Sequence, residues 1–148
     1  MKSLGGIRMP SAKVLQKGLE TDRRWMLIDE QNMFMTQRVH HKMALFKTSW
    51  MDGMLRITHG TASINIPSTV AGGPVQAQIW DDTVTVAEVD ATVSKWFSDQ
   101  LSMTCRLVAF PEGNSRPVDP RYKVGDDQVS LADGYPVLII GQGTLDDL

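Results

Sequence analysis

Turn-forming residues recur roughly every eight to twelve positions through the first two-thirds of the chain, and this spacing is the strongest constraint on its fold. Between the turns, apolar and polar residues alternate, or β-branched and aromatic residues gather, as they do in antiparallel strands. Asp52-Gly53 suits a two-residue hairpin turn, and a second hairpin is expected across Asp81-Asp82. The ranges expected to form strands are 24–28, 33–37, 46–51, 55–58, 62–66, 75–79 and 84–86.

The periodicity changes after the last of these hairpins, where four apolar residues fall at i, i+3, i+4 and i+8. This spacing predicts one amphipathic helix over about 90–101, with Asp90 as its N-cap. Strand character returns over 105–110, and a last buried strand is expected over 137–140. The range 111–127 contains three prolines and two glycines, which favours a long ordered loop or linker. The four apolar residues of the helix are Val93, Trp96, Phe97 and Leu101.

Together these elements predict an α+β fold, with a mostly antiparallel β-barrel or strongly curved sheet of about seven to nine strands and one principal helix. Closing the sheet on itself would remove its unpaired edges. We expect a barrel domain over 1–110, followed by a linker and junction over 111–148. The last five residues, 144–148, are typical of an N-cap and a first helical turn. Such a turn is not stable alone, so we expect the chain to continue into a further domain.

The overall charge argues against a general nucleic-acid or membrane-surface binder, because the formal net charge of the 148 residues is only −2. Any anion must therefore be held by a few placed cations. No apolar run is long enough to span a bilayer, and 1–6 lacks the apolar core of a secretory signal, so we expect a cytoplasmic protein. The single cysteine, Cys105, opens an apolar strand and is expected to be a small core side chain.

Two arginines at the ends of strand-like runs, Arg23 and Arg38, are candidates for an anion site. A guanidinium offers a planar fork that matches phosphate oxygens. In a strand, Arg23 and the adjacent Arg24 would point to opposite faces, with Trp25 on the side of Arg23. A surface ion pair between Arg23 and a nearby aspartate is the alternative, and the residues alone favour it.

Lys2 and Ser3, followed by Gly5-Gly6, place an ammonium, a hydroxyl and a flexible backbone together, a combination that can hold a phosphate. The spacing is not that of a P-loop, and a frayed terminus is the alternative. His40-His41 is a weak metal candidate, because adjacent side chains rarely converge on one ion. No Gly-x-Ser-x-Gly motif supports a serine hydrolase. We therefore expect neither a catalytic residue nor a metal ligand in this chain.

Several short motifs follow one another in an order that resembles a known family. They are Lys2-Ser3, 22–27 (Asp-Arg-Arg-Trp-Met-Leu), 36–38 (Thr-Gln-Arg), 43–45 (Met-Ala-Leu), 105–108 (Cys-Arg-Leu-Val), 116–121 (Arg-Pro-Val-Asp-Pro-Arg), 132–138 (Ala-Asp-Gly-Tyr-Pro-Val-Leu) and 144–148 (Thr-Leu-Asp-Asp-Leu). In this order they resemble the N-terminal β-barrel domain that precedes the MOSC (molybdenum cofactor sulfurase C-terminal) domain. The family includes YcbX-like proteins and the mitochondrial amidoxime-reducing component.

The resemblance implies a molybdenum-dependent reductase of N-hydroxylated compounds, in which two domains together hold a pterin-based molybdenum cofactor (molybdopterin). The N-terminal domain would lend phosphate and pterin contacts, carried over by motif to Lys2, Ser3 and Arg23, with Arg38 as a further candidate. The MOSC domain, with the cysteine that binds molybdenum, would be the partner in cis or in trans, and the intact enzyme would also meet a redox partner protein. We expect the segment alone to be inactive. The alternative is a stand-alone binding or scaffold module without molybdenum cofactor.

Overall fold

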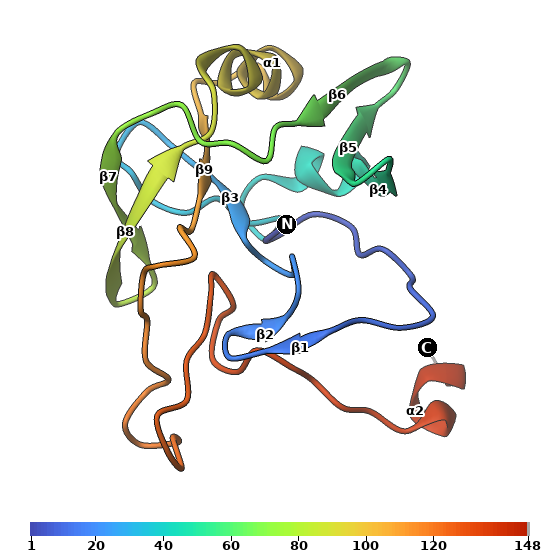
Figure 1. Ribbon diagram of the computed structural model, residues 1–148. Helices are drawn as coiled ribbons and strands as arrows, with labels where there is room; N and C mark the ends of the chain where they lie inside the picture. The colour runs from blue at the N-terminus through green and yellow to red at the C-terminus, as the bar shows by residue number, and fades with distance from the viewer. Residues whose placement is uncertain (148) are drawn as a thin grey trace.

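The computed structural model describes residues 1–147 and shows an α+β fold built mostly from antiparallel strands (Figure 1). The described residues form a two-stranded sheet, β1-β2, a four-stranded sheet in the order β3-β9-β8-β7 and a three-stranded sheet in the order β4-β5-β6. The strands are β1 (Val14–Leu15), β2 (Gly18–Leu19), β3 (Trp25–Ile28), β4 (Lys47–Met51), β5 (Met54–His59), β6 (Ala62–Ile66), β7 (Pro74–Ile79), β8 (Asp82–Glu88) and β9 (Arg106–Ala109). The helices are the 3-10 helix η1 (His41–Leu45), α1 (Ala91–Leu101) and α2 (Gln142–Asp146). The predicted fold class and principal helix are confirmed.

The four-stranded sheet curls toward closure because the segment after β3 bridges its two edge strands. Phe34 forms an isolated bridge with Ile28 of β3, and Met33 forms one with Gln78 of β7. The Phe34 amide also donates to the Gln78 carbonyl at 3.0 Å. The range 33–37 therefore makes single bridges instead of the expected strand. These bridges satisfy backbone groups on both edges, which is how a small antiparallel sheet avoids open edges.

Helix α1 packs over β9 and β6 and covers the larger of the two main apolar clusters (Figure 1). Its N-cap is Asp90, whose carboxylate accepts hydrogen bonds from the Thr92 and Val93 amides at 2.7 and 3.2 Å. Phe97 is fully buried on the inner face of the helix. Cys105 is 2% exposed in the same cluster, so its expected role as a core side chain is confirmed. A second cluster is formed by Met26, Ile28, Ala77, Ile79, Val84, Val86, Val108, Phe110 and Leu131.

The hairpin turns show one confirmed prediction and one shift of register. Asp52 and Gly53 both adopt positive φ, 51° and 75°, and join β4 to β5 as expected. The turn predicted at Asp81-Asp82 lies one residue earlier, because Ile79 of β7 pairs with Asp82 of β8 and leaves Trp80 and Asp81 in the loop. Trp80 has a φ of 52°. The shift matters because it brings the Trp80 side chain to the site described below.

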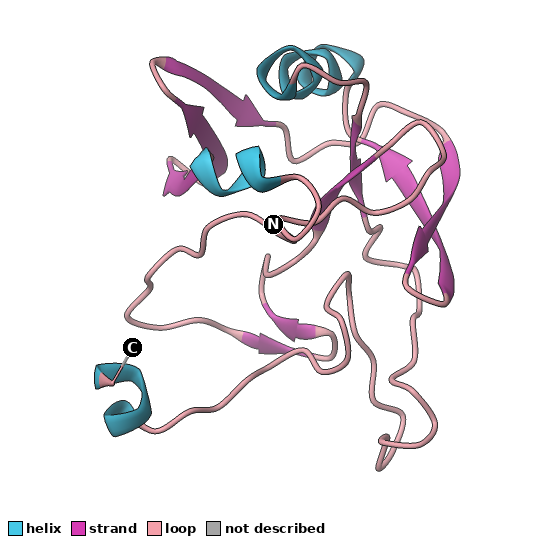
Figure 2. Cartoon of the chain, turned by 180° about the vertical axis from the view of Figure 1, so that it is seen from behind, coloured by secondary structure: helices cyan, strands magenta, loops and turns pink. Residues whose placement is uncertain are grey.

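The segment after β9 lacks the last strand that was predicted for it. Figure 2 shows that it runs mainly as loop until α2. Leu138 and Ile139 are 81% and 89% exposed, and 137–140 forms no strand, so the predicted buried strand is wrong. An apolar run becomes a buried strand only where a neighbouring strand pairs with it, and none of the described strands does so. Thr144 lies inside α2, whose N-cap is Gly141, so the predicted helix start at Thr144 is wrong. Residue 148 of that predicted turn lies outside the described residues.

A buried charge cluster fastens the hairpin β1-β2 to the segment that follows β9. Arg24 is 5% exposed, its Nε lies 2.9 Å from Glu112 Oε1, and its Nη1 donates to the Lys17 carbonyl at 3.4 Å. Lys17 is also buried and donates its ammonium to the Glu112 carbonyl. The single carboxylate of Glu112 therefore balances a guanidinium that is almost fully withdrawn from water.

Replacing Glu112 with glutamine is expected to lower the free energy of unfolding by about 1–2 kcal/mol, because it leaves the Arg24 charge uncompensated at a partly solvated pair. Urea denaturation followed by circular dichroism measures the change. Glu30→Gln is the control, since Glu30 is exposed and its carboxylate lies within no ion pair of the described residues. Equal stability of the two variants would contradict the assigned role of Glu112.

Candidate functional anion site

A shallow pocket of about 310 Å³ lies where the N-terminal segment, the segment after β3 and the β7-β8 turn meet. It brings together residues that are far apart in the sequence, including two of the four predicted site residues, Ser3 and Arg38. The lining residues are Ser3, Leu4, Phe34, Thr36, Gln37, Arg38, Trp80 and Asp133. We therefore compare the positions of the four predicted site residues with this pocket.

Lys2 lies against this pocket and is held in place from two sides. Its backbone amide donates to the Trp25 carbonyl at 2.8 Å, which fixes the N-terminal segment along the start of β3. Its ammonium forms an ion pair with Asp133 Oδ1 at 2.5 Å and lies 5.1 Å from the centroid of the Phe34 ring. Burial lowers the pKa of Lys2, and the hydrogen bond and charge of Asp133 offset this only in part. Lys2 is thus an ordered cation and not part of a frayed terminus.

Arg38 is the exposed cation of the pocket. Its guanidinium lies over the Trp80 ring, with Cζ 5.5 Å from the ring centroid. Among the described residues, none offers Arg38 a carboxylate within ion-pair distance. A guanidinium oriented by an aromatic face, with its donors open to solvent, is suited to an oxyanion.

Ser3 lines the pocket together with Arg38 and has a left-handed backbone conformation, with φ of 57°. Its carbonyl accepts a hydrogen bond from Gln37 Nε2 at 3.0 Å, which joins the N-terminal segment to the segment that carries Arg38. A non-glycine residue at positive φ carries strain that the surrounding contacts must hold, and such residues cluster at binding sites. The Ser3 side chain is half-buried at the pocket wall.

Arg23 does not line this pocket, and the expected strand geometry around it is wrong. β3 begins at Trp25, and Arg23 lies in the preceding turn with φ of 47°. Its Nε lies 3.5 Å from Asp22 Oδ2, and its Nη1 donates to the Pro136 carbonyl at 3.5 Å. The alternative of a surface ion pair is thus present. The Arg23 charge nevertheless acts on Lys2, whose pKa it lowers, so Arg23 belongs to the same cationic neighbourhood.

Asp133 is the residue that sequence reasoning missed. Its Oδ1 accepts from the Lys2 ammonium and from Trp80 Nε1 at 2.9 Å, although its side chain is 61% exposed. Burial alone would raise the pKa of Asp133, but the hydrogen bonds from Lys2 and Trp80, with the charges of Lys2 and Arg38, hold it below its ordinary value. Asp133 is part of the Ala132-Asp-Gly motif, yet nothing in that motif predicts a contact with Lys2, which lies 131 positions earlier.

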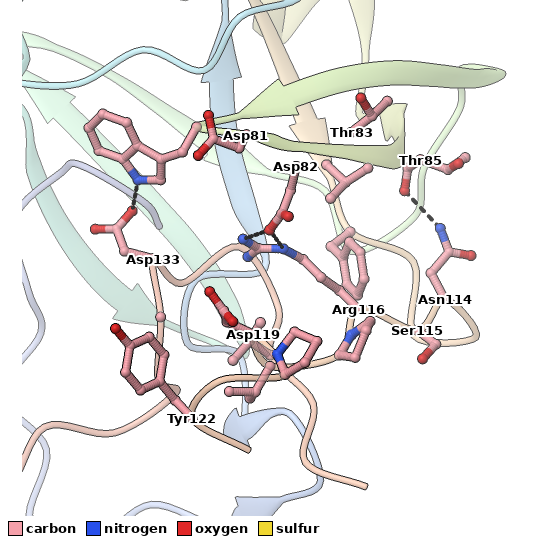
Figure 3. Close-up of a pocket in the computed structure, with 18 of the residues that line it drawn as sticks. Asp81, Asp82, Thr83, Thr85, Asn114, Ser115, Arg116, Asp119, Tyr122 and Asp133 are labelled. Carbon is pink, nitrogen blue, oxygen red and sulfur yellow. Dashed lines mark hydrogen bonds and ion pairs between the residues drawn. The ribbon is translucent and has the colours of Figure 1, made fainter.

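A larger cavity of about 830 Å³ shares the lining residues Trp80 and Asp133 with the smaller pocket (Figure 3). Arg116 lies at its centre and is buried, with Asp82 Oδ2 2.6 Å from its Nη2. Asp81 and Asp119 also line the cavity. The hydrogen bonds from Arg121 lower the pKa of Asp119 to about 2. The lining contains four carboxylates, including that of Asp133, against the guanidinium of Arg116, so the wall carries more negative than positive charge. The larger cavity therefore does not suit a phosphate, whereas the smaller pocket does.

The described residues contain no group of three or more His, Cys, Asp or Glu side chains that could hold a metal ion. His41 Nδ1 donates a hydrogen bond to the Gln37 carbonyl at 2.9 Å, and η1 starts at this residue. Burial raises the pKa of the Cys105 thiol, which is the opposite of what a metal ligand needs. Within 1–147, no helix has the length and apolar character needed to cross a membrane.

Comparison with known proteins points to one family. Residues 1–104 match the family described as the MOSC N-terminal beta barrel domain. The chain is 28% identical over 160 residues to mitochondrial amidoxime-reducing component 1 of Mus musculus, an alignment that covers 100% of the chain and 47% of the relative. It is 28% identical over 169 residues to the molybdenum cofactor sulfurase of Aspergillus niger, covering 92% of the chain and 20% of that protein. The chain thus spans about half the length of the first relative and a fifth of the second.

A second molybdenum cofactor sulfurase and one solved structure are also similar to this chain. The molybdenum cofactor sulfurase of Chaetomium globosum is 29% identical over 143 residues, covering 76% of the chain and 17% of the relative. A protein of Bordetella bronchiseptica with a known solution structure superposes with a TM-score of 0.51 at 17% sequence identity. That superposition covers 69% of this chain and 89% of the other, and it supports the fold alone.

Proposed function

The chain belongs to the family of MOSC N-terminal beta barrel domains, and from this premise we propose that it supplies the phosphate contacts of a molybdenum-cofactor protein. The observation that carries the proposal is the shared pocket of Ser3 and Arg38, with the Lys2 ammonium behind Asp133. The proposal is also supported by three relatives that are named for amidoxime reduction or for molybdenum cofactor sulfuration. We assign any oxidoreductase activity to a protein that carries both domains, and not to these residues alone.

The donor set of the pocket fits one end of such a cofactor. Lys2 and Arg38 offer positive charge, and Ser3 offers a hydroxyl, which are the groups that neutralise and orient a phosphate. Arg23 would add charge from the adjacent turn. The described residues have no set of metal ligands, and Cys105 is enclosed by the core. When bound, the molybdenum would supply the redox chemistry, while this domain would hold the phosphate and neutralise its charge.

Replacing Arg38 with alanine is expected to weaken the binding of inorganic phosphate about tenfold, because one charge-assisted contact is worth roughly 1.5 kcal/mol or more. Backbone amide shifts of Ser3 and Leu4 during a phosphate titration of the chain measure the affinity. Arg23→Ala should weaken binding less, since Arg23 lies outside the pocket lining.

Arg8→Ala is the matched control, because Arg8 is exposed and does not line the pocket. It removes the same charge and should leave the phosphate affinity within about twofold. In a homologue that carries both domains, Arg23→Ala and Arg38→Ala should lower the molybdenum content found by elemental analysis while the barrel stays folded. Unchanged amide shifts with phosphate in the wild-type chain would overturn the proposal.

A binding or scaffold module without cofactor is the second candidate, and the exposed apolar run 137–140 favours it. A module of this kind would use the run to contact another protein body and would have no need of the cations around Ser3. The phosphate titration separates the two candidates, since only the first requires shifts at the pocket. The division into a barrel over 1–110 and a linker over 111–148 stays a prediction under both.

A further inference from the structure

One carboxylate lies where the positive charges of the pocket meet. The Asp133 side chain contacts the Lys2 ammonium directly, and the charge of Arg38 acts on it from the pocket side. Arg116 and Arg23 act on Lys2 in turn. Asp133 therefore occupies a position that favours an anion, and it does so as part of the chain itself.

The Asp133 carboxylate accepts hydrogen bonds through one of its two oxygens among the described residues. Oδ1 takes both the hydrogen bond from Lys2 and the hydrogen bond from Trp80 Nε1, whereas the described residues provide no partner for Oδ2. The Asp133 side chain is 61% exposed, while Lys2 is 5% exposed. The cation is thus fixed in the protein, and its anionic partner lies at the solvent side, on a stretch without helix or strand. Asp133 is therefore the member of this ion pair that a dissolved anion can reach.

A phosphate and the Asp133 carboxylate would compete for the Lys2 ammonium, because two anions at contact distance repel each other. We propose that Asp133 is a displaceable internal anion, which occupies the position of the phosphate and leaves Lys2 and Trp80 when phosphate binds. This inference rests on the proposed function. It makes Asp133 a competitor that lowers the affinity of the site and that keeps the buried Lys2 charge paired while the site holds no anion.

Asp133→Asn tests the competition, because the amide oxygen can still accept a hydrogen bond while the negative charge is lost. Phosphate affinity, measured by amide shifts at mildly acidic pH, is expected to rise about three- to tenfold. Asp81→Asn is the matched control, since Asp81 precedes Asp82 in the same turn region, borders only the larger cavity and lies within no ion pair of the described residues. It removes the same charge but should change the affinity by less than about twofold.

The Trp80 indole supplies a direct readout of displacement. In the wild type, phosphate should shift the Trp80 Nε1–H resonance as its hydrogen bond to Asp133 breaks, and Trp80→Phe identifies that resonance. In Asp133→Asn, phosphate should shift this resonance less than half as far. Retained circular dichroism and thermal transition in each variant exclude unfolding as the cause.

The outcomes separate the two proposals. Binding by the wild type with a gain in Asp133→Asn supports both. Binding by the wild type with equal or weaker binding in Asp133→Asn, or with no shift of the Trp80 indole, overturns the displacement and leaves the phosphate site standing. No binding by either protein overturns the phosphate site and the displacement together. A similar gain in Asp81→Asn would show a general charge effect and would also overturn the displacement.

Discussion

Phe97→Ala is expected to lower the free energy of unfolding by about 3–5 kcal/mol, one of the two largest effects among the substitutions considered. Phe97 is fully buried, with its ring centroid 5.6 Å from that of Phe46 and 5.0 Å from that of Trp96. Its ring joins α1 to the three-stranded sheet, because Phe46 directly precedes β4. Removal leaves a cavity between two rigid elements, and packed interiors collapse only partly around such a void.

Urea denaturation measures the loss at Phe97, and an unchanged slope of the free energy against urea shows that the change is in stability alone. Phe97→Leu should cost less, because it restores part of the volume. Asp99→Ala is the control on the same helix, where the exposed pair of Asp99 with Lys95 predicts a change below about 0.5 kcal/mol. A loss of less than about 1 kcal/mol in Phe97→Ala would contradict the packing described.

Arg116→Met is expected to have the second large effect, about 3–5 kcal/mol, because it leaves two buried carbonyls without a donor and breaks the ion pair with Asp82. Nε and Nη2 donate to Asp82 Oδ2 at 3.1 and 2.6 Å. Nη1 donates to the carbonyls of Ser130 and Ala132 at 2.9 and 2.6 Å. One guanidinium therefore fastens the segment before Asp133 to the first residue of β8.

Hydrogen exchange of the Val129 and Leu131 amides measures the effect locally, since these amides bond to the carbonyls of Arg116 and Arg23. Both should exchange much faster in Arg116→Met. Arg121→Met is the control, because Arg121 lies in the same segment, its side chain is 76% exposed and its pair with Asp119 is open to solvent. Equal exchange in both variants would show that Arg116 does not hold the segment.

Arg116 also links the fold to the anion site. The Ala132 carbonyl that it binds directly precedes Asp133, so the position of the internal carboxylate depends on this buried contact. The residues 118, 129 and 132 form a small apolar cluster of their own, which packs the same segment. The predicted linker is therefore an ordered part of the structure around the site, although it contains neither helix nor strand before α2.

The sequence predicted local structure well where the signal is local. The Asp52-Gly53 turn and the helix capped by Asp90 were both predictable, because turn chemistry and apolar spacing act within a few residues. The same reasoning misplaced the turn at Trp80 by one residue and predicted a buried strand at 137–140. Those two features depend on strand register and on a pairing partner, which alternation within one segment does not specify.

For the candidate site, the residues could be predicted from the sequence, whereas their arrangement in space could not. Residue type and family motif were enough to name Lys2, Ser3, Arg23 and Arg38 as candidates, because charge and hydrogen-bond donors are properties of the individual residue. Their geometry could not be predicted. Three features of the site depend on how the whole chain folds. Ser3 and Arg38 line one pocket, Arg23 lies in a neighbouring turn outside it, and Lys2 contacts Asp133.

By itself, the sequence determined the strand-rich fold class, the principal helix, the family and the set of cations, because these follow from short-range patterns and residue chemistry. Only the tertiary structure decided which cations meet and which carboxylate already lies among them. The physical reason is that an electrostatic site is made by distances of a few ångströms between residues more than a hundred positions apart, and no local pattern encodes such distances.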